Sequence, residues 1–335
     1  MLKFKNPNKA RRVDDITYEY LEKPENIDLF DMCKTQYKLF REKLNEKNWQ
    51  EVAAELYGKN NGWLFKIITN QNRSDFLFLL DIEKNHLALD LGADWGQVAI
   101  PLSKFCDVIA VENNIEKVDI MKKIAEQEHR SNLQFVVANI SDKIFEHEQF
   151  NLVIFNGVLE LMGTFSNGNP IELQQDALNE AYQLLKPGGV LYMSIENKYD
   201  LKYILGERDD HTGFKGLVYL TRDTAQRIFE AETGKELRIF MHSKKEYENM
   251  LKKAGFQNIK FFGDLPNHKL PNVVIDLSNN SGPSFAAQNL DFVEEYEGSM
   301  GERSNYNEKL KYLYQIFSGE ELINLYPSFS IIAKK

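Results

Sequence analysis

Short apolar runs alternate with amphipathic stretches through the middle of this chain. The runs are of strand length, and the stretches between them place apolar residues at helical spacing. Strands and helices that alternate in this way predict a parallel sheet with helices on both faces. The expected strands are residues 87–91, 108–111, 133–137, 152–155 and 190–194. The sequence Lys186-Pro187-Gly188-Gly189 predicts a turn just before the fifth strand.

The part of the chain before residue 85 has a helical pattern. Apolar residues between positions 39 and 49 are spaced as on one amphipathic helix. Ser74 is placed to cap a second helix, which leads into the first strand. We therefore predict that residues 1–84 form a helical N-terminal extension that caps the core.

Helix and strand signals continue after the fifth strand. A helix is expected near residues 221–233, and Ser243 with Glu246 forms a capping box for another that stops at Gly255. A strand at 256–262 and a terminal strand at 328–333 suit an antiparallel edge on an otherwise parallel sheet.

The segment between these last two strands is punctuated by prolines and by a turn-rich stretch. Apolar residues at positions 310, 313, 314 and 317 have helical spacing. We predict a core of residues 85–262 plus 328–335, and an insertion at 263–327 that contains a helix and forms a lid.

The composition limits the partners and the compartment. With 335 residues and 43% hydrophobic content, the chain can form a large α/β core and an appended subdomain. Its net charge of −9 argues against a broad cationic surface for nucleic acid. Cys33 and Cys106 form no disulfide framework or zinc cluster. Without a secretory apolar core or a membrane span, the protein is expected to be soluble and cytoplasmic.

Two acidic residues mark the ends of the first two expected strands. Asp90 is followed by a turn that contains Gly92 and Gly96, which is the strand-to-turn-to-helix opening of a nucleotide-binding domain. Glu112 ends the second strand, where a carboxylate can accept both ribose hydroxyls of an adenosine cofactor. From these two segments alone, the cofactor is either a dinucleotide or S-adenosylmethionine.

Later motifs distinguish between these two cofactors. The chain resembles class I S-adenosylmethionine-dependent methyltransferases over residues 85–262 and in its last strand. The motifs that carry the resemblance are Asp90-Leu-Gly-Ala-Asp-Trp-Gly96, Glu112, Ala138-Asn-Ile140, Phe150-Asn-Leu-Val-Ile-Phe-Asn-Gly-Val-Leu-Glu160 and Leu185-Lys-Pro-Gly-Gly189. The resemblance implies a Rossmann-like methyltransferase sheet, mostly parallel with one antiparallel edge strand, and S-adenosylmethionine as the cofactor.

The resemblance also implies a set of cofactor contacts. Glycines in the turn let the backbone approach the methionine part, the acid after the second strand holds the ribose, and a later pair meets the adenine. A further pair should lie under the sulfonium. The implied cofactor-binding residues are Asp90, Gly92, Asp94, Gly96, Glu112, Asn113, Asn139, Ile140, Asn156 and Gly157.

The chain departs from the commonest family pattern in three places. Asp94 replaces the middle glycine of the turn, Asn139 replaces the adenine acid, and Leu161 stands where a histidine often follows Glu160. Asp94 is tolerable if its side chain points away from the cofactor, and its carboxylate could attract the methionine ammonium. Trp95 is expected to pack in the core rather than stack on the cofactor.

The acceptor and the general base are predicted from histidine placement. A hydroxyl acceptor must lose a proton, so a histidine or carboxylate is expected beside it. His211 lies in the loop after the fifth strand, where a substrate loop should cross the pocket, and Asp210 is placed to orient its ring. His242 and Glu160 are alternative bases, and no metal site is expected.

Two further segments resemble a branch of bacterial methyltransferases associated with glycan and polysaccharide biosynthesis. They are Glu196-Asn-Lys-Tyr-Asp-Leu-Lys202 with Asp210-His-Thr-Gly213, and Leu265-Pro-Asn-His-Lys-Leu-Pro271. This resemblance implies a small-molecule or glycan acceptor that is methylated on a hydroxyl. A homodimer and a complex with a biosynthetic enzyme both stay open.

Two other classes of function stay open as well. One is an N-methyltransferase of nucleic acid or protein, although Asn156 is followed by Gly-Val-Leu rather than by Pro-Pro and an aromatic residue. The other is a cofactor-binding partner without transfer activity, which the departures at Asp94 and Asn139 motivate.

Overall fold

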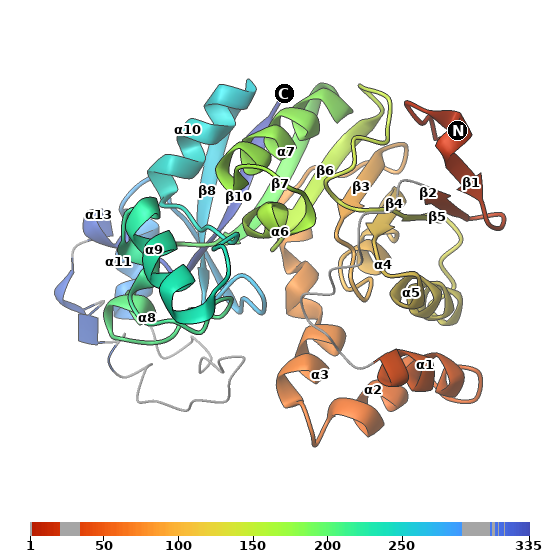
Figure 1. The fold of residues 1–335 in the computed structure, drawn as a ribbon, viewed down its shortest axis with the longest axis horizontal. Helices are drawn as coiled ribbons and strands as arrows, with labels where there is room; N and C mark the ends of the chain where they lie inside the picture. Colours follow the sequence, from red (N-terminus) through yellow and green to blue (C-terminus); the bar gives the residue numbers. More distant parts are fainter. Residues whose placement is uncertain (1, 21–33, 290–308, 310–311, 314, 318) are drawn as a thin grey trace. The chain divides into compact units, whose positions relative to one another are not determined.

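The computed structural model describes residues 2–20, 34–289, 309, 312–313, 315–317 and 319–335 (Figure 1). The chain divides into two compact units. The first unit comprises residues 1–156, 179–192 and 335, and the second comprises residues 157–178 and 193–334. No helix in the described part of the chain has both the length and the apolar character needed to cross a bilayer.

A mostly parallel sheet forms the centre of the first unit. Its strands are β1 (Ala10–Arg12), β2 (Thr17–Tyr20), β3 (Leu87–Leu91), β4 (Asp107–Glu112), β5 (Leu133–Val137), β6 (Phe150–Asn156) and the first part of β7 (Leu185–Glu196). Their order is β1-β2-β5-β4-β3-β6-β7. The four pairings from β2 to β6 are all parallel, as the alternation of strands and helices predicts.

Helices of the first unit pack along this sheet and on one another. Helix α4 (Ala99–Leu102) contacts β4, and α5 (Ile115–Gln127) contacts β4 and β5. Helix α1 (Lys34–Lys43) packs on α5 and on α2 (Trp49–Tyr57), which in turn contacts α3 (Gly62–Thr69) (Figure 1). Two 3-10 helices, η1 (Pro7–Lys9) and η2 (Gln71–Leu79), complete the N-terminal part.

The prediction of a helical extension over residues 1–84 is wrong for its first part. β1 and β2 form an antiparallel hairpin, and β2 extends the parallel sheet beside β5. Thr17 and Tyr20 of β2 are buried, and the ring of Phe4 stacks on that of Phe145. Such a short edge strand has little intrinsic propensity, and its packing against neighbours stabilises it instead.

Two predicted helix boundaries also need correction. The single helix expected through residues 39–49 is two helices, because the Asn48 side chain accepts a hydrogen bond from Gln50 N at 2.9 Å and starts α2. Asn70 rather than Ser74 caps η2, accepting from Asn72 N at 2.9 Å. The Ser74 hydroxyl instead donates to a carbonyl within η2.

The second unit has an antiparallel sheet edge. Residues 193–196 of β7 are followed in strand order by β10 (Ser328–Lys334), β8 (Gln257–Leu265) and β9 (Val273–Asp276). β10 pairs antiparallel with β8, and β8 pairs antiparallel with β9. The predicted fold class, a mostly parallel α/β sheet with an antiparallel edge, is confirmed. Among the described residues, the helices of this unit include η3 (Leu159–Leu161), α6 (Met162–Phe165), α8 (Leu201–Ile204), η4 (Leu217–Tyr219), α9 (Arg222–Thr233), α10 (Lys244–Ala254), α11 (Ser281–Gln288) and α13 (Gly319–Leu322).

Helix α7 (Pro170–Leu184) contributes residues to both units. The capping box at the start of α10 is confirmed, because Ser243 N donates to Glu246 Oε2 at 2.7 Å and Glu246 N donates back to Ser243 Oγ. The left-handed Gly255 ends this helix as predicted.

The predicted insertion at 263–327 is partly a continuation of the sheet. β9 pairs with β8 over four residue pairs, so residues 273–276 belong to the core rather than to a lid. The helix expected around residues 310–317 falls partly on residues 310, 311 and 314, which lie outside the described part. Residues 312, 313, 315 and 316 are helical.

The turn predicted at residues 186–189 is part of β7. Lys335 continues the pairing of its neighbours there, with Gly188 N donating to Lys335 O and Lys335 N donating to Gly189 O at 3.0 Å. Gly188 has a φ of 77°, the value that a turn with proline second and glycine third requires, so the predicted turn is present within the strand, beside the pairing with Lys335.

Candidate functional site

A tight turn joins β3 to α4 in the first unit. Gly92, Asp94 and Gly96 have positive φ angles of 77°, 49° and 80°. The backbone N–H of Gly92 donates to the carbonyl of Val111 at 3.0 Å, which ties the turn to β4. A Cβ atom at Gly96 would lie 2.8 Å from Ile100 Cδ1, in a conformation that side chains rarely adopt. The turn therefore requires glycine at its end.

Glu112 is the last residue of β4, and its side chain is buried beside this turn. Its Oε2 accepts the N–H of Asp94 at 3.1 Å, and its Oε1 accepts the N–H of Asn114 at 3.0 Å. Burial raises the pKa of this carboxyl, and Lys117 partly offsets the rise. Each oxygen can accept a further hydrogen bond, so the carboxylate can hold the turn and a ligand hydroxyl together.

The Asp94 side chain is already paired. Its Oδ1 lies 2.6 Å from Lys117 Nζ, and its Oδ2 accepts from Gln97 Nε2 at 3.1 Å. Burial alone would raise the pKa of Asp94, but the Lys117 ammonium holds it below its usual value. The carboxylate that could attract a methionine ammonium is therefore engaged by a lysine of the protein.

Asn139 lies just beyond the end of β5 and is buried. Its Oδ1 accepts from both the N–H and the hydroxyl of Ser141 at 3.0 Å. The carboxylate of Asp142 accepts the N–H of Asn139 at 3.2 Å, and burial raises the pKa of Asp142. The half-buried Ile140 lies between these polar residues. An acid is thus present in this loop, three residues later than the family pattern places it.

Two buried side chains on the adjacent strands β3 and β6 have unmet hydrogen-bonding capacity. Within the described part of the chain, no partner reaches Asp90 Oδ2 or either polar atom of the Asn156 side chain. Burial raises the pKa of Asp90 to about 7. Buried polar groups without partners cost free energy, and a polar ligand at the carboxyl ends of these strands would satisfy them.

In the second unit, Glu160, Glu196 and His211 lie together although they come from distant parts of the chain. Glu160 is on η3, Glu196 ends β7, and His211 is in the loop after α8. His211 Nε2 lies 4.0 Å from Glu160 Oε1 and 3.9 Å from Glu196 Oε1. All three side chains are at most 5% exposed, so this group, the acid–histidine cluster, is withdrawn from solvent.

The other ring nitrogen of His211 faces Asp209. Its Nδ1 lies 3.3 Å from Asp209 Oδ1, which also accepts the backbone N–H of His211 at 3.0 Å. The Thr212 hydroxyl donates to Asp209 Oδ2 at 2.6 Å. The carboxylate is thereby fixed in a tight turn, and it orients the imidazole.

Lysines accompany the acid–histidine cluster. Lys269 Nζ lies 3.0 Å from Glu196 Oε1 and 3.3 Å from Asp210 Oδ2. Lys202 Nζ lies 3.4 Å from the same Asp210 oxygen. Asp210 therefore joins two ammonium groups, and their positive charge keeps the pKa of Asp210 below its usual range although burial opposes it.

The pKa values within the cluster move in different directions. Burial and the neighbouring Glu196 raise the pKa of Glu160 to about 8. Burial alone would lower the pKa of His211, but Glu196 and Asp209 raise it to about 9. Burial alone would raise the pKa of Glu196, but Lys269 and two histidines hold it well below its usual value. Negative charge thus concentrates on Glu196.

Comparison with known protein families assigns the chain. A family model described as a methyltransferase domain matches residues 82–261, from just before β3 into β8. The chain belongs to this methyltransferase family. An uncharacterized protein of Methanocaldococcus jannaschii is 26% identical over 242 residues, which cover 70% of this methyltransferase and 85% of that relative.

Solved structures resemble the chain more distantly. The YcgJ protein from Bacillus subtilis has a TM-score of 0.45 and 14% identity, and covers 79% of this chain and 97% of its own. Phosphoethanolamine N-methyltransferase 2 of Haemonchus contortus, in complex with S-adenosylmethionine, has a TM-score of 0.44 and 16% identity. The match covers 88% of this chain and 60% of that protein. At this distance, neither structure identifies the acceptor of this methyltransferase.

The protein is an S-adenosylmethionine-dependent methyltransferase, and its first unit fits that cofactor. The buried carboxylate of Glu112 suits ribose hydroxyls, and the unsatisfied groups of Asp90 and Asn156 suit a ligand rich in donors and acceptors. The backbone of the turn at Gly92 and Gly96 carries no Cβ that would keep a ligand away.

The structure brings only part of the predicted catalytic set together. Glu160 and His211 are neighbours. Asp210 was expected to orient the imidazole, but Asp209 does so, because the turn directs consecutive side chains to different partners. His242 is not among these neighbours: its Nε2 lies 2.7 Å from Gln174 Oε1, and burial lowers its pKa to about 4. It does line a cavity together with Asp209 and Thr212.

The sequence prediction did not include four residues at these sites, namely Glu196, Lys269, Lys117 and Asp209. Glu196 and Lys269 lie inside segments that resemble the glycan-associated branch, so those motifs could have indicated them. Lys117 lies in the first turn of α5, where a solvent-facing lysine is the ordinary expectation. Asp209 stands next to Asp210, and the sequence does not show which of the two faces His211.

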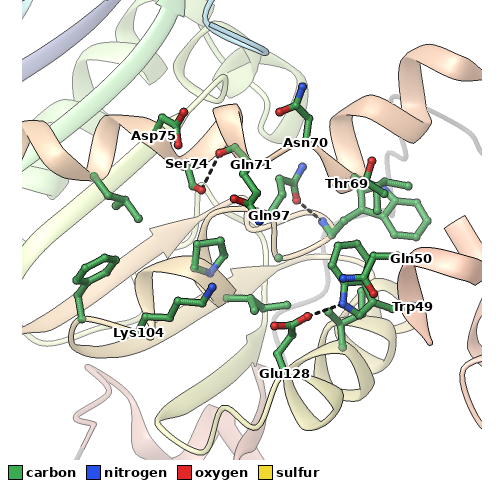
Figure 2. Close-up of a pocket in the computed structure, with 18 of the residues that line it drawn as sticks. Trp49, Gln50, Thr69, Asn70, Gln71, Ser74, Asp75, Gln97, Lys104 and Glu128 are labelled. Atoms are coloured by element: carbon green, nitrogen blue, oxygen red, sulfur yellow. Dashed lines mark hydrogen bonds between the residues drawn. The ribbon is translucent and has the colours of Figure 1, made fainter. Parts of the chain in front are cut away.

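A cavity of about 610 Å³ lies beside the glycine turn in the first unit (Figure 2). Figure 2 shows Trp49 hydrogen-bonded to Glu128 at one end of the cavity, and Ser74 and Gln71 along another wall. Gly96 belongs to its lining, but Glu112 does not. This cavity is therefore distinct from the carboxyl ends of β4 and β5.

Proposed function

We propose that this methyltransferase acts on a hydroxyl group of a sugar, a glycan or a related small molecule. The observation that carries the proposal is the buried acid–histidine cluster, with Asp209 fixed behind the imidazole of His211. A hydroxyl must lose its proton as it accepts a methyl group, and such groups supply that help. A carboxylate or a neutral amine acceptor needs little of it.

In the proposed reaction, the acceptor oxygen forms a bond to the methyl carbon while the carbon–sulfur bond breaks. S-adenosylhomocysteine leaves with the electron pair, and the hydroxyl proton passes to the acid–histidine cluster or to water. Much of the acceleration of such an in-line displacement comes from holding the two reactants at short range. Bound S-adenosylmethionine supplies an activated methyl group.

The proposed cofactor residues keep most of the roles that the family resemblance implies. Glu112 accepts the ribose hydroxyls, while the amides of the glycine turn meet the methionine part. Asp94 contributes through its backbone, because Lys117 engages its carboxylate. The proposed set in the first unit is Asp90, Gly92, Asp94, Gly96, Glu112, Asn113, Asn139, Ile140 and Asn156.

We expect Glu112→Ala to weaken S-adenosylmethionine binding at least tenfold, because a charge-assisted hydrogen bond is worth about 1.5–3 kcal/mol. The substitution also removes the acceptor that fixes Asp94 N in the turn. Glu112→Gln keeps one acceptor oxygen, so its affinity for S-adenosylmethionine should lie between those of the native protein and Glu112→Ala. Calorimetric titration measures the affinities. Asp107→Asn, at the exposed opposite end of the same strand, is the matched control. Equal affinities for Glu112→Ala and the native protein would contradict the ribose role.

A cavity in the second unit supports a small acceptor. Its volume is about 420 Å³, within the usual range of small-molecule sites, and Asp209 and Thr212 line it together with apolar residues. Lys198 and Arg222 are also in its wall, together with Glu246, whose Oε1 lies 3.6 Å from Lys198 Nζ. The Arg222 guanidinium favours an acceptor that carries an acidic or phosphate group. Glu160, Glu196 and His211 do not line this cavity, so we propose that it holds the part of the acceptor remote from the reacting hydroxyl. We also propose that the reaction takes place in the cytoplasm.

A panel of acceptors tests the proposed function. The purified protein is incubated with S-adenosylmethionine and nucleotide sugars, sugar phosphates, uronic acids or small primary amines, and S-adenosylhomocysteine is quantified. We expect turnover with a sugar that carries an acidic or phosphate group, and a product with a new O-methyl group by mass spectrometry. Turnover confined to the amines would replace this proposal by N-methylation.

A further inference from the structure

The acid–histidine cluster has the spacing of a metal site. The three facing atoms, Glu160 Oε1, Glu196 Oε1 and His211 Nε2, all lie within 4.8 Å of one another. The separations of 3.9 Å and 4.0 Å from the imidazole nitrogen are too long for hydrogen bonds. Ligand atoms that each lie about 2.0–2.2 Å from one ion in tetrahedral geometry are about 3.3–3.6 Å apart, so a bound ion would draw these three side chains closer together.

The carboxylates of this cluster are short of hydrogen-bond donors. In the described part of the chain, no donor forms a hydrogen bond with Glu160 Oε2 or with Glu196 Oε2, although both residues are 2% exposed. Lys269 Nζ lies 3.0 Å from the other oxygen of Glu196, Oε1. A buried carboxylate oxygen without a partner costs free energy, and a bound cation would relieve that cost.

Space beside the cluster is kept open by Gly157. This residue has a φ of +68°, and a Cβ built on it would lie 3.3 Å from His268 Nε2 and 3.7 Å from Glu160 Oε1. His268 is 1% exposed, and its Nε2 is 4.0 Å from Glu196 Oε1. A second imidazole therefore borders the same small space, which the absence of a side chain at position 157 leaves free.

Acidic side chains outnumber lysines around this space. Four of them, those of Glu160, Glu196, Asp209 and Asp210, lie beside two lysines, and the remaining positive group, His211, loses its proton when its Nε2 ligates a metal. An ammonium ligand would duplicate Lys269, which already holds Glu196 and Asp210. Converging imidazole and carboxylate groups are instead the donor set of manganese, iron and zinc.

We propose that Glu160, Glu196 and His211 hold a divalent transition-metal ion. The proposal rests on the O-methylation proposed above, because a hydroxyl that coordinates such an ion releases its proton to water more easily than a free alcohol. The ligand atoms come from η3, the end of β7 and the loop after α8. Asp209, which fixes the His211 ring through Nδ1, completes the arrangement as the hydrogen-bond partner that metal-binding histidines ordinarily have.

Manganese binding tests this proposal without any acceptor. The full-length protein, stripped with a chelator, is titrated with Mn²⁺, and free ion is followed by electron paramagnetic resonance. We expect saturable binding. Glu160→Gln and His211→Ala should each weaken it at least about tenfold, since even the hydrogen-bond partners of metal ligands contribute 10–100-fold. Lys269→Met should tighten binding, because it removes the ammonium that competes for Glu196 Oε1.

The weaker binding expected for His211→Ala separates a specific site from general attraction to a negative protein, because this substitution removes a ligand without removing any negative charge. Circular dichroism melts show whether each variant is folded. If Glu160→Gln or His211→Ala does not fold, Glu196→Gln is used in its place in the metal titration. The metal proposal is wrong if the native protein binds neither Mn²⁺ nor Zn²⁺ saturably. It is also wrong if the variants of the proposed ligands bind the metal with the same affinity as the native protein. Methylation of a hydroxyl acceptor that persists in excess chelator would contradict the metal proposal and support O-methylation. Saturable metal binding without methylation of any hydroxyl acceptor would support the metal site and contradict O-methylation.

Discussion

Replacing His211 by alanine should lower kcat by about 10²–10⁴-fold, the range expected when a group that activates a hydroxyl is removed. The affinity for S-adenosylmethionine should stay nearly constant, because the predicted cofactor contacts come from other residues. His211→Asn should be almost as poor, since an amide can neither take up a proton nor ligate a metal as an imidazole does. Steady-state kinetics with saturating acceptor and a calorimetric titration of the cofactor give the two readouts.

Two matched variants define the meaning of that loss. Asp209→Asn should reduce kcat by about 10–100-fold, because it disturbs the partner of His211 Nδ1 without removing the ring. His147→Ala, at an exposed histidine of the first unit, should leave kcat unchanged. If His211→Ala keeps more than about a tenth of native kcat, short of the expected range, the role passes to His242 or Glu160. An acceptor that needs no activation would be the remaining explanation.

Trp95→Ala should lower the free energy of unfolding by about 3–5 kcal/mol, the usual cost of truncating a buried large aromatic residue. Trp95 is 3% exposed, and its ring lies 5.3 Å from Phe40, 5.5 Å from Tyr37 and 6.1 Å from Tyr57, measured between centroids. The substitution would therefore leave a void between the glycine turn and helices α1 and α2. Urea unfolding followed by circular dichroism measures the change.

An exposed aromatic residue provides the control for Trp95. Phe78 is 78% exposed, so Phe78→Ala should change stability by less than about 0.5 kcal/mol. Trp95→Phe should cost less than the alanine variant and should keep cofactor affinity within about threefold, because the side chain packs in the core. A large loss of cofactor affinity in a well-folded Trp95→Phe protein would show that the ring stacks on the ligand instead.

The sequence predicted those parts of the fold that depend on repeated patterns. The five central strands are apolar runs buried on both faces, so their positions follow from hydrophobicity alone. The sequence did not predict β2, because a four-residue edge strand is stabilised by its pairing with β5 rather than by the propensity of its own residues. The capping box at Ser243 was predictable because both of its partners are local.

The candidate site was only half predictable for the same reason. Asp90, Glu112 and Asn156 each end or nearly end a recognisable strand, and parallel strands bring their carboxyl ends to one edge. The acid–histidine cluster joins residues up to 51 positions apart, from Glu160 to His211, and no periodicity relates them. Whether Asp209 or Asp210 faces the imidazole depends on one turn of the loop, which residue types do not specify.

The glycine turn also bears on how such proteins are recognised. Three of its positions adopt left-handed backbone angles, yet one of them is Asp94, held by Lys117 from the following helix. Aspartate is among the few residues that tolerate this conformation, and the ion pair here adds a tertiary contact to it. A motif written as a series of dihedral angles would include this chain, whereas one written as three glycines would miss it. Distant relatives that replace the same glycine should then carry a compensating cation at the start of the helix corresponding to α5, a pairing that can be sought in sequences without any structure.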